Sequence, residues 1–347
     1  MQNHLLKKSR AFDMVYLDET SLDYIPSTKG IDVQDFELAM GRHLGVDQCI
    51  ATNSGTSALH LALLACGIGK GDKVLVPATT FIATANAVSY TGAKVVFADV
   101  DRNTWCFRGR SERSTRAVVL VCLYGNTEFN FVPAYRLFRS SQVCIVDAAE
   151  ITELVECIGS IFIGSSWWNP IRPHYNCFSF NGNKNMTTGG GGLIVGKDLD
   201  EIRSMINPGS YDGVGYNYGM TALSARLGLE QLKILDEHKE KKKRFNEIYR
   251  ENLKHRLIFQ CVTGTPWMTA VLFPNGTDIP KTQNTLKDRG VPTRRVFEPL
   301  NHFKPYMDGK TYPVAEDIWK RGLCLPSSVR NSEEDIYEVC QKIKGLL

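Results

Sequence analysis

Residues 178–192 have the sequence FSFNGNKNMTTGGGG, and the interpretation of the whole chain starts from this stretch. It begins as a short apolar strand, continues as a polar turn with one lysine, Lys184, and ends in a glycine run. Glycine tolerates positive φ and lets backbone or ligand come close. A lysine in such a turn is a candidate amine nucleophile, because an amine with a lowered pKa can form a Schiff base with an aldehyde. The alternative is a surface lysine in a glycine-rich loop.

A second segment has the pattern of an anion-binding loop. Residues 49–52 predict a short strand, residues 53–57 (NSGTS) a turn, and residues 58–66 a helix. The free N–H groups and the positive dipole end at a helix N-terminus point at an anion. The hydroxyls of Ser54 and Thr56 could add hydrogen bonds. A capped helix without a ligand is the alternative reading.

The strands that follow alternate with helices. Continuous or nearly continuous apolar runs predict strands over residues 73–77, 94–100, 117–123 and 143–146. Such alternation indicates a parallel sheet with helices on both faces, in which ligands collect at the carboxyl ends of the strands. Asp147 ends one of these strands and is a candidate buried carboxylate, although a helix N-cap role is also open. Phe81, near the start of a predicted helix, could stack on a flat ring.

Composition excludes several classes of protein. The chain has 347 residues, a hydrophobic content of 43%, a charged content of 22% and a net charge of only +4, which gives no reason to expect nucleic acid binding. The basic run at 239–244 is interpreted as a solvated helix face. The ten cysteines have no C-x-x-C pair or metal-ligand spacing, so no metal is expected and a reducing compartment is favoured. Without a signal peptide or an apolar span, the chain is expected to be cytoplasmic and not membrane-bound.

The chain is long enough for two domains. We predict a large domain over residues 1–235, with an N-terminal arm, and a smaller α/β domain over residues 236–347. In the smaller domain the patterns predict helices over 239–253, 281–289 and 332–343 and strands over 269–273 and 291–297. Residues 151–174, with Trp167-Trp168, are expected to form a loop over or beside the site.

These features together fit one cofactor. An anion loop, a stacking aromatic ring, a strand-end aspartate and a loop lysine are what pyridoxal 5′-phosphate requires. The phosphate suits the helix N-terminus, the aspartate keeps the ring nitrogen protonated, and the lysine bonds to the aldehyde.

The sequence resembles the sugar aminotransferases of the DegT/DnrJ/StrS type. The matching pieces run in family order, at 52–59, 77–86, 147–150, 178–192, 215–221 and 322–327. The resemblance implies the aspartate aminotransferase-like fold type I of pyridoxal-phosphate enzymes. Its large domain carries a mostly parallel seven-stranded sheet, followed by a smaller C-terminal α/β domain.

The resemblance also implies roles for individual residues. Lys184 would hold the cofactor covalently and move the proton, Asp147 would pair with the pyridine nitrogen, and Glu150 would lie near the phenolic oxygen. The phosphate would be held by Ser54, Gly55, Thr56 and Ser179, and the ring face would be covered by Phe81. Asn217 would reach the phosphate of the other subunit, so a homodimer is expected. Substrate contacts are expected from Asn181, Arg294 and Arg295, although a surface role for the two arginines is equally open.

The variant residues at 147–150 and 180–184 resemble members that aminate C4 of nucleotide-linked 4-keto-6-deoxy sugars. We therefore expect transfer from glutamate, through pyridoxamine 5′-phosphate, to dTDP-4-keto-6-deoxy-D-glucose, giving the viosamine nucleotide. Amination at C3, or a catalytically silent homologue acting as a binding module, are the alternatives. Lys184 argues against the related dehydratases, which carry histidine there. Segments 101–116 and 151–174 depart from the family pattern.

Overall fold

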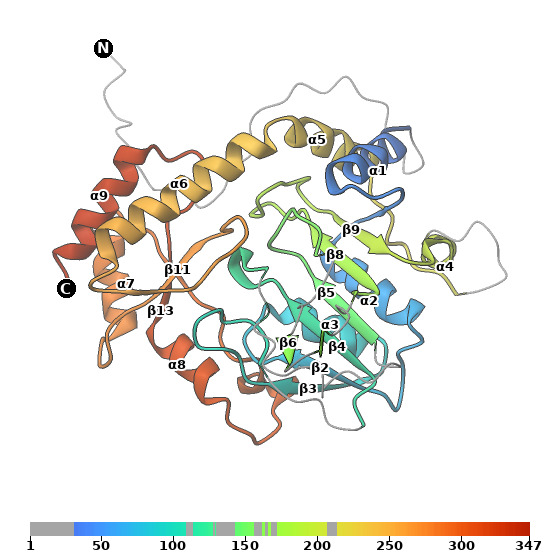
Figure 1. Cartoon of the computed structure of the whole chain (residues 1–347), viewed down its shortest axis with the longest axis horizontal. Coiled ribbons are helices and arrows are strands. Elements are labelled where there is room, and N and C mark those ends of the chain that lie inside the picture. Colours follow the sequence, from blue (N-terminus) through green and yellow to red (C-terminus); the bar gives the residue numbers. More distant parts are fainter. Residues whose placement is uncertain are drawn as a thin grey trace, which may run out of the picture.

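The computed structural model describes residues 31–108, 114–127, 129, 143–155, 162–163, 166–167, 172–206 and 214–347. A seven-stranded sheet forms the centre (Figure 1), in the order β1 (Ile50–Thr52), β9 (Gly192–Gly196), β8 (Tyr175–Ser179), β5 (Val143–Asp147), β4 (Ala117–Val121), β2 (Lys73–Pro77) and β3 (Lys94–Ala98). The strand β9 pairs antiparallel with β1 and with β8, and the other neighbouring strands of this sheet pair in parallel. The predicted mostly parallel seven-stranded sheet is therefore confirmed.

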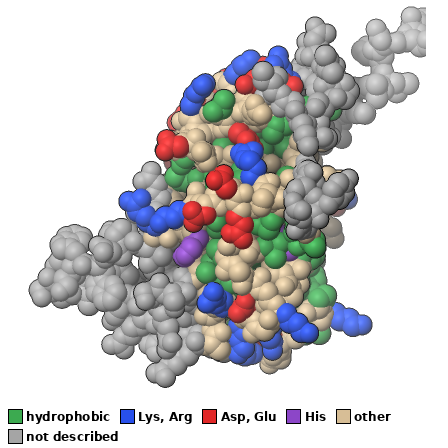
Figure 2. Space-filling view, turned by 90° about the vertical axis from the view of Figure 1, so that its right-hand side faces the viewer, with side chains coloured by type: hydrophobic (Ala, Val, Ile, Leu, Met, Phe, Trp, Pro, Cys, Tyr) green, Lys and Arg blue, Asp and Glu red, His purple; other side chains and the backbone are tan. Residues whose placement is uncertain are grey.

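Three helices gather beside the edge of the sheet formed by β1 and β9: α1 (Ile31–Leu44), α4 (Leu199–Met205) and α5 (Ala222–Lys233). The ring of Phe36 in α1 meets the ring of Phe180 edge-on at 5.6 Å. A Cβ on Gly228 of α5 would come within 2.4 Å of the Phe36 ring, so a glycine is needed where the two helices cross. Figure 2 views the molecule from this side and shows acidic and basic side chains interspersed over the surface.

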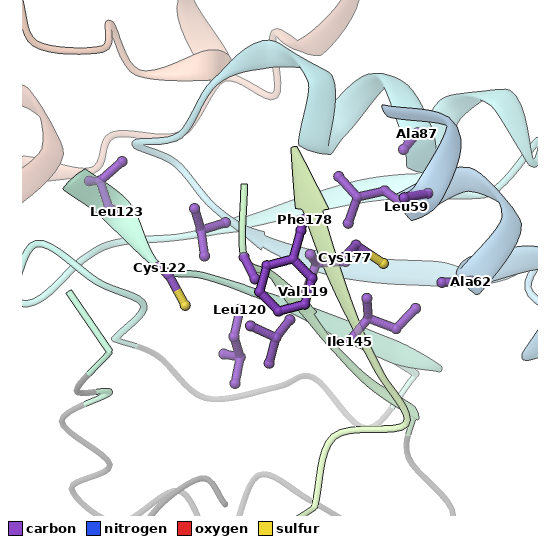
Figure 3. Packing of buried hydrophobic residues seen from close by; sticks show 14 of the residues in the cluster. Leu59, Ala62, Ala87, Val119, Leu120, Cys122, Leu123, Ile145, Cys177 and Phe178 are labelled. Carbon is purple, nitrogen blue, oxygen red and sulfur yellow. The ribbon is translucent and has the colours of Figure 1, made fainter. Parts of the chain in front are cut away.

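The core lies between the sheet and the helices α2 (Gly55–Ala65) and α3 (Ile82–Tyr90). All five residues of β4 are buried, which explains its uninterrupted apolar sequence. Figure 3 shows Phe178 of β8 beside Ile145 of the adjacent strand β5 and Val119 of β4, with Leu59 of α2 nearby. The packing of α2 against the sheet fixes the position of this helix and of the loop at residues 53–54 that precedes it.

The C-terminal part has a second, antiparallel sheet, in the order β10 (Ile258–Phe259), β11 (Thr269–Leu272), β13 (Gly322–Leu325) and β12 (Arg294–Arg295). Four helices surround it: α6 (Leu235–Leu253), α7 (Ile279–Asp288), α8 (Pro313–Arg321) and α9 (Glu333–Lys344). Short 3₁₀ turns occur at Leu123–Gly125, Leu300–His302 and Lys304–Tyr306.

The predicted border at 235/236 coincides with the start of α6, and the division into two domains stays a prediction. No helix in the described ranges is long and apolar enough to cross a membrane.

Three local expectations need correction. The strand predicted at 291–297 is limited to the two residues of β12, since Pro292 has no N–H for a ladder. Within 151–174, β6 (Phe162–Ile163) and β7 (Ser166–Trp167) pair as antiparallel strands rather than forming only a loop. In the basic run at 239–244, Lys242 is buried instead of solvated, because it lies on the same face of α6 as Phe245.

Candidate active site

A cavity of about 400 Å³ lies at the carboxyl ends of the parallel strands. One wall comes from the ends of β1, β2, β4, β5 and β8, and the facing wall comes from the C-terminal part of the chain. Of the residues predicted from sequence, the cavity is lined by Ser54, Gly55, Thr56, Phe81, Asp147, Glu150, Ser179, Asn181, Lys184 and Arg294. Residues more than 100 positions apart thus share one site.

The turn after β8 carries Lys184 into this cavity. Its backbone N–H donates to the carbonyl of Asn181 at 3.0 Å, which closes the turn. The side chain is 11% exposed, and Nζ lies 3.3 Å from Oε1 of Glu150. Nζ also lies 3.8 Å from the ring centroid of Trp267. The amine is therefore held between a carboxylate and an aromatic face, at the edge of open space.

Glu150 is held from two sides. Its Oε1 accepts a hydrogen bond from Nζ of Lys184, and its Oε2 accepts one from the backbone N–H of Tyr124 at 2.7 Å. Tyr124 has a φ of 55°, a left-handed conformation that is uncommon for a residue other than glycine. Burial raises the pKa of Glu150, and the Lys184 ammonium and the Tyr124 N–H offset this only in part.

Asp147 ends β5 and lies under the cavity. Its Oδ2 accepts the hydroxyl of Thr84 at 2.6 Å, and its Oδ1 accepts the N–H of Ala149 at 3.1 Å. Burial raises the pKa of Asp147, while Thr84, Ala149 and the more distant Lys184 lower it. Since burial outweighs the stabilising groups, this carboxylate is suited to a further cationic partner in the cavity.

The predicted anion loop caps α2. The side-chain oxygen of Ser54 accepts the N–H of Ser57 at 3.1 Å. A Cβ on Gly55 would lie 2.7 Å from Cβ of Ser179, and a Cβ on Gly192 would lie 2.5 Å from the carbonyl oxygen of Ser54. The glycines therefore let the end of β8 and the start of β9 approach the loop closely. Hydroxyls and helix N–H groups converge here, as an anion requires.

Two predicted residues stand apart from the cavity wall. The side chain of Asn217 is exposed, while its backbone carbonyl accepts the amide of Asn53 at 3.1 Å. Arg295 lies with its guanidinium 5.5 Å from the ring of Trp319 and donates to the Trp319 carbonyl. Arg294 lines the cavity but Arg295 does not, because adjacent side chains of a strand point to opposite faces.

An aromatic wall of the cavity was not predicted from the sequence. The rings of Tyr124 and Phe297 stack at 5.3 Å and 16°, and those of Tyr124 and Trp267 at 6.1 Å and 13°. Trp267 and Phe297 line the cavity, and Phe297 lies 5.8 Å from the half-exposed ring of Phe81. No local pattern marks these rings, because they converge from three distant segments.

A lysine and a buried aspartate that line one cavity at the strand ends are the residue types that pyridoxal-phosphate-dependent enzymes use to hold their cofactor. Residues 19–344 match the model of the DegT/DnrJ/EryC1/StrS aminotransferase family. The chain belongs to this family, as the resemblance had predicted. It is accordingly an aminotransferase whose cofactor is pyridoxal 5′-phosphate.

Known relatives agree with this assignment. The GDP-perosamine synthase of Escherichia coli O157:H7 is 32% identical over 99% of this chain and 96% of its own length. A DegT DnrJ EryC1 StrS aminotransferase from Brucella abortus superimposes with a TM-score of 0.76 and 27% identity, over 92% of this chain and 91% of that one. The sugar aminotransferase Spr1654 of Streptococcus pneumoniae, solved in its PLP form, has a TM-score of 0.79 at 20% identity over 93% and 92% of the two chains. The last similarity supports the fold.

Proposed function

We propose that the protein transfers the amino group of glutamate to C4 of a nucleotide-linked 4-keto-6-deoxy sugar. The observation that carries the proposal is the meeting of Lys184, Asp147 and Glu150 in one cavity beside an anion loop. The retained lysine and aspartate weigh against a catalytically silent binding module.

The cavity residues fit the cofactor. The buried carboxylate of Asp147 would pair with the protonated pyridine nitrogen, which would offset the effect of burial on Asp147. The hydroxyls of Ser54, Thr56 and Ser179 and the N–H groups at Gly55 and Thr56 would hold the phosphate. Phe81 would cover one face of the ring. When bound, pyridoxal phosphate supplies an electron sink for the bond that is cleaved at the amino donor.

Lys184 would have two tasks. Its amine would tether the cofactor in the resting enzyme, and once released its Nζ would take the proton from Cα of the amino donor. Glu150, 3.3 Å from Nζ, would hold the released amine in the cavity. The ionised carboxylate of Asp147 would accept a hydrogen bond from the protonated ring nitrogen and so keep that nitrogen protonated.

The substrate assignment draws on the E. coli relative, whose name, GDP-perosamine synthase, specifies a GDP-linked amino sugar. We favour a GDP-linked 4-keto-6-deoxy sugar over the dTDP-linked sugar expected from sequence. Arg294, on the cavity wall, would bind an anionic group such as the diphosphate or the donor carboxylate, and Asn181 would bind the sugar.

The proposal includes a homodimer in the cytoplasm. Asn217 is exposed beside the anion loop, which suits a residue that reaches the phosphate of a second subunit. A dimer should therefore be found by light scattering, and Asn217→Ala should weaken cofactor binding without changing the fold.

The test is a panel of GDP-, dTDP- and UDP-linked 4-keto-6-deoxy sugars, each incubated with glutamate and the yellow, cofactor-loaded protein. We expect amination of the GDP-linked sugar and, by NMR of the product, nitrogen at C4. Nitrogen at C3 of a 3-keto isomer would replace the proposal with the alternative regiochemistry. A purified protein that takes up no pyridoxal phosphate would refute it.

A further inference from the structure

Trp267 contacts the lysine turn in two places. Its indole Nε1–H donates to the backbone carbonyl of Asn183, the residue before Lys184, at 2.6 Å. Its ring face lies 3.8 Å from Nζ of Lys184. A cation over the face of an indole ring is attracted by the ring quadrupole. One side chain from the C-terminal part of the chain therefore contacts both the backbone and the amine of the turn.

Trp267 is itself fixed on the side away from the turn. Its N–H donates to the carbonyl of Tyr124 at 3.0 Å, and its ring stacks on the Tyr124 ring. Its carbonyl accepts Nζ of the buried Lys242 at 2.9 Å. Trp267 is 2% exposed, so its ring has little freedom to rotate. A fixed ring can restrict a flexible neighbour.

The flexible side chain of Lys184 is the neighbour that such a ring would restrict. A lysine amine ends a four-carbon chain of rotatable bonds, and one ion pair with Glu150 at 3.3 Å leaves several rotamers open. The hydrogen bond to Asn183 fixes where this chain begins, and the ring face limits where it ends.

We propose that Trp267 is a positioning residue for Lys184, which holds the amine toward the aldehyde of the cofactor. The inference rests on the proposed role of Lys184 as the tethering amine. In the tethering step, the neutral Nζ amine would form a C=N bond with the aldehyde carbon. The two hydrogens of that amine and the aldehyde oxygen would leave as one water molecule, and Trp267 would take no part in the bond changes.

The experiment compares two forms of the cofactor on cofactor-free protein by equilibrium dialysis. Pyridoxal phosphate can bond to Lys184, whereas pyridoxamine phosphate has no aldehyde and cannot. Trp267→Phe, which loses the bond to Asn183 but keeps a ring, should weaken pyridoxal phosphate binding about fivefold. Trp267→Leu, which loses both contacts, should weaken it about tenfold or more. Pyridoxamine phosphate binding should change by less than about twofold.

A double-mutant cycle tests whether Trp267 acts through the lysine. In Lys184→Ala protein, Trp267→Phe should leave the affinity for pyridoxal phosphate unchanged, because the tether is already absent. Trp319→Phe, in α8, is the matched control and should leave both affinities as in the wild type. Thermal melts would confirm that the Phe variants are folded, should Trp267→Leu be unstable.

Equal weakening of both cofactor forms by Trp267→Phe would overturn the inference and make Trp267 a simple cavity wall. Unchanged pyridoxal phosphate binding would overturn it as well, as would an effect of Trp267→Phe that persists in Lys184→Ala protein. A wild-type protein that binds neither cofactor form would instead refute the proposed function.

Discussion

Lys184 and Lys242 both contact Trp267, and their surroundings differ in every other respect. Lys184 lies on the indole face, at the edge of the cavity, with Glu150 as its ion-pair partner. Lys242 lies inside α6, 3% exposed, and donates to the Trp267 carbonyl. Among the described residues, no acidic side chain pairs with Lys242, and burial lowers its pKa to about 7.

The comparison teaches that a lowered pKa does not by itself make a lysine a catalytic group. Lys242 has a lowered pKa, as an amine nucleophile needs. It does not line the cavity, however, and is buried where no substrate can reach it. Lys184 has access, a carboxylate and a fixed aromatic neighbour. Access and geometry therefore separate Lys184, the proposed reactive amine, from the structural amine of Lys242.

The largest effect is expected from Lys184→Ala. Loss of the tether and of the proton-transfer group should lower kcat by about 10³-fold or more, with the cofactor still bound. Single-turnover assays with glutamate would measure it. Lys243→Ala, which removes an exposed lysine of α6, is the matched control and should retain activity. Turnover by Lys184→Ala close to that of the wild type would contradict the comparison.

Asp147→Asn tests the carboxylate side of the cavity. Removing the charge that would hold the ring nitrogen protonated should lower kcat/KM about 100-fold, because a preorganised charge is lost. Asp236→Asn, on the exposed surface of α6, serves as the control. If Asp147→Asn kept its activity within about twofold, the buried carboxylate would have no electrostatic task in the reaction.

Lys242→Met should change stability and its dependence on pH. Burial lowers the pKa of this lysine to about 7 in the folded protein from its ordinary value of 10.5, so the unfolded chain binds more protons between these values. Above the unfolded pKa, Lys242 is neutral in both states and its burial carries no penalty from protonation. As the pH falls toward 7, the unfolded chain takes up a proton that the folded protein does not, and the free energy of unfolding decreases. Relative to Lys242→Met, the wild type should gain about 2 kcal/mol in free energy of unfolding between pH 7 and pH 9.

Urea unfolding at the two pH values would measure this gain. Lys241→Met, one residue earlier in α6, controls for the loss of a lysine from the same helix. A difference between wild type and Lys242→Met that does not vary with pH would mean that Lys242 keeps an ordinary affinity for its proton in the folded protein.

The smallest effect is expected from Thr84→Val. The Thr84 hydroxyl lowers the pKa of Asp147, so its removal should raise that pKa further and leave more of the carboxyl protonated. The acid limb of the pH–activity profile should move to higher pH, with activity about tenfold lower on that limb and recovering as pH rises. Thr285→Val in α7, whose hydroxyl donates to a helix carbonyl, should leave the profile in place.

Sequence patterns predicted much of the fold. The strand predicted at 73–77 matches the bounds of β2, and the helix predicted over 239–253 ends at Leu253, as α6 does. The helix α8 was not predicted, although Pro313 at its first position is a local signal that could have been used. The pairing of β6 with β7 was not predicted either.

The candidate site also contains residues that the sequence predicted and residues that it did not. Lys184, Asp147 and the loop around Gly55 follow buried strands, and the carboxyl ends of parallel strands meet at one edge of the sheet. The side to which Arg295 points could not be predicted, because a two-residue strand gives no periodicity from which to choose its face. Trp267 and Tyr124 were missed because their contacts join segments far apart in the chain.

The sequence by itself determined the parallel sheet, the phosphate-type loop and the lysine and aspartate at the strand ends, because each depends on short-range patterns of apolar residues, glycines and caps. Only the tertiary structure decided which lysine is buried without access, which arginine faces the cavity, and that an aromatic wall holds the amine. Those outcomes depend on the packing of the C-terminal segments against the sheet, and contacts between distant segments leave no period or motif in a single sequence.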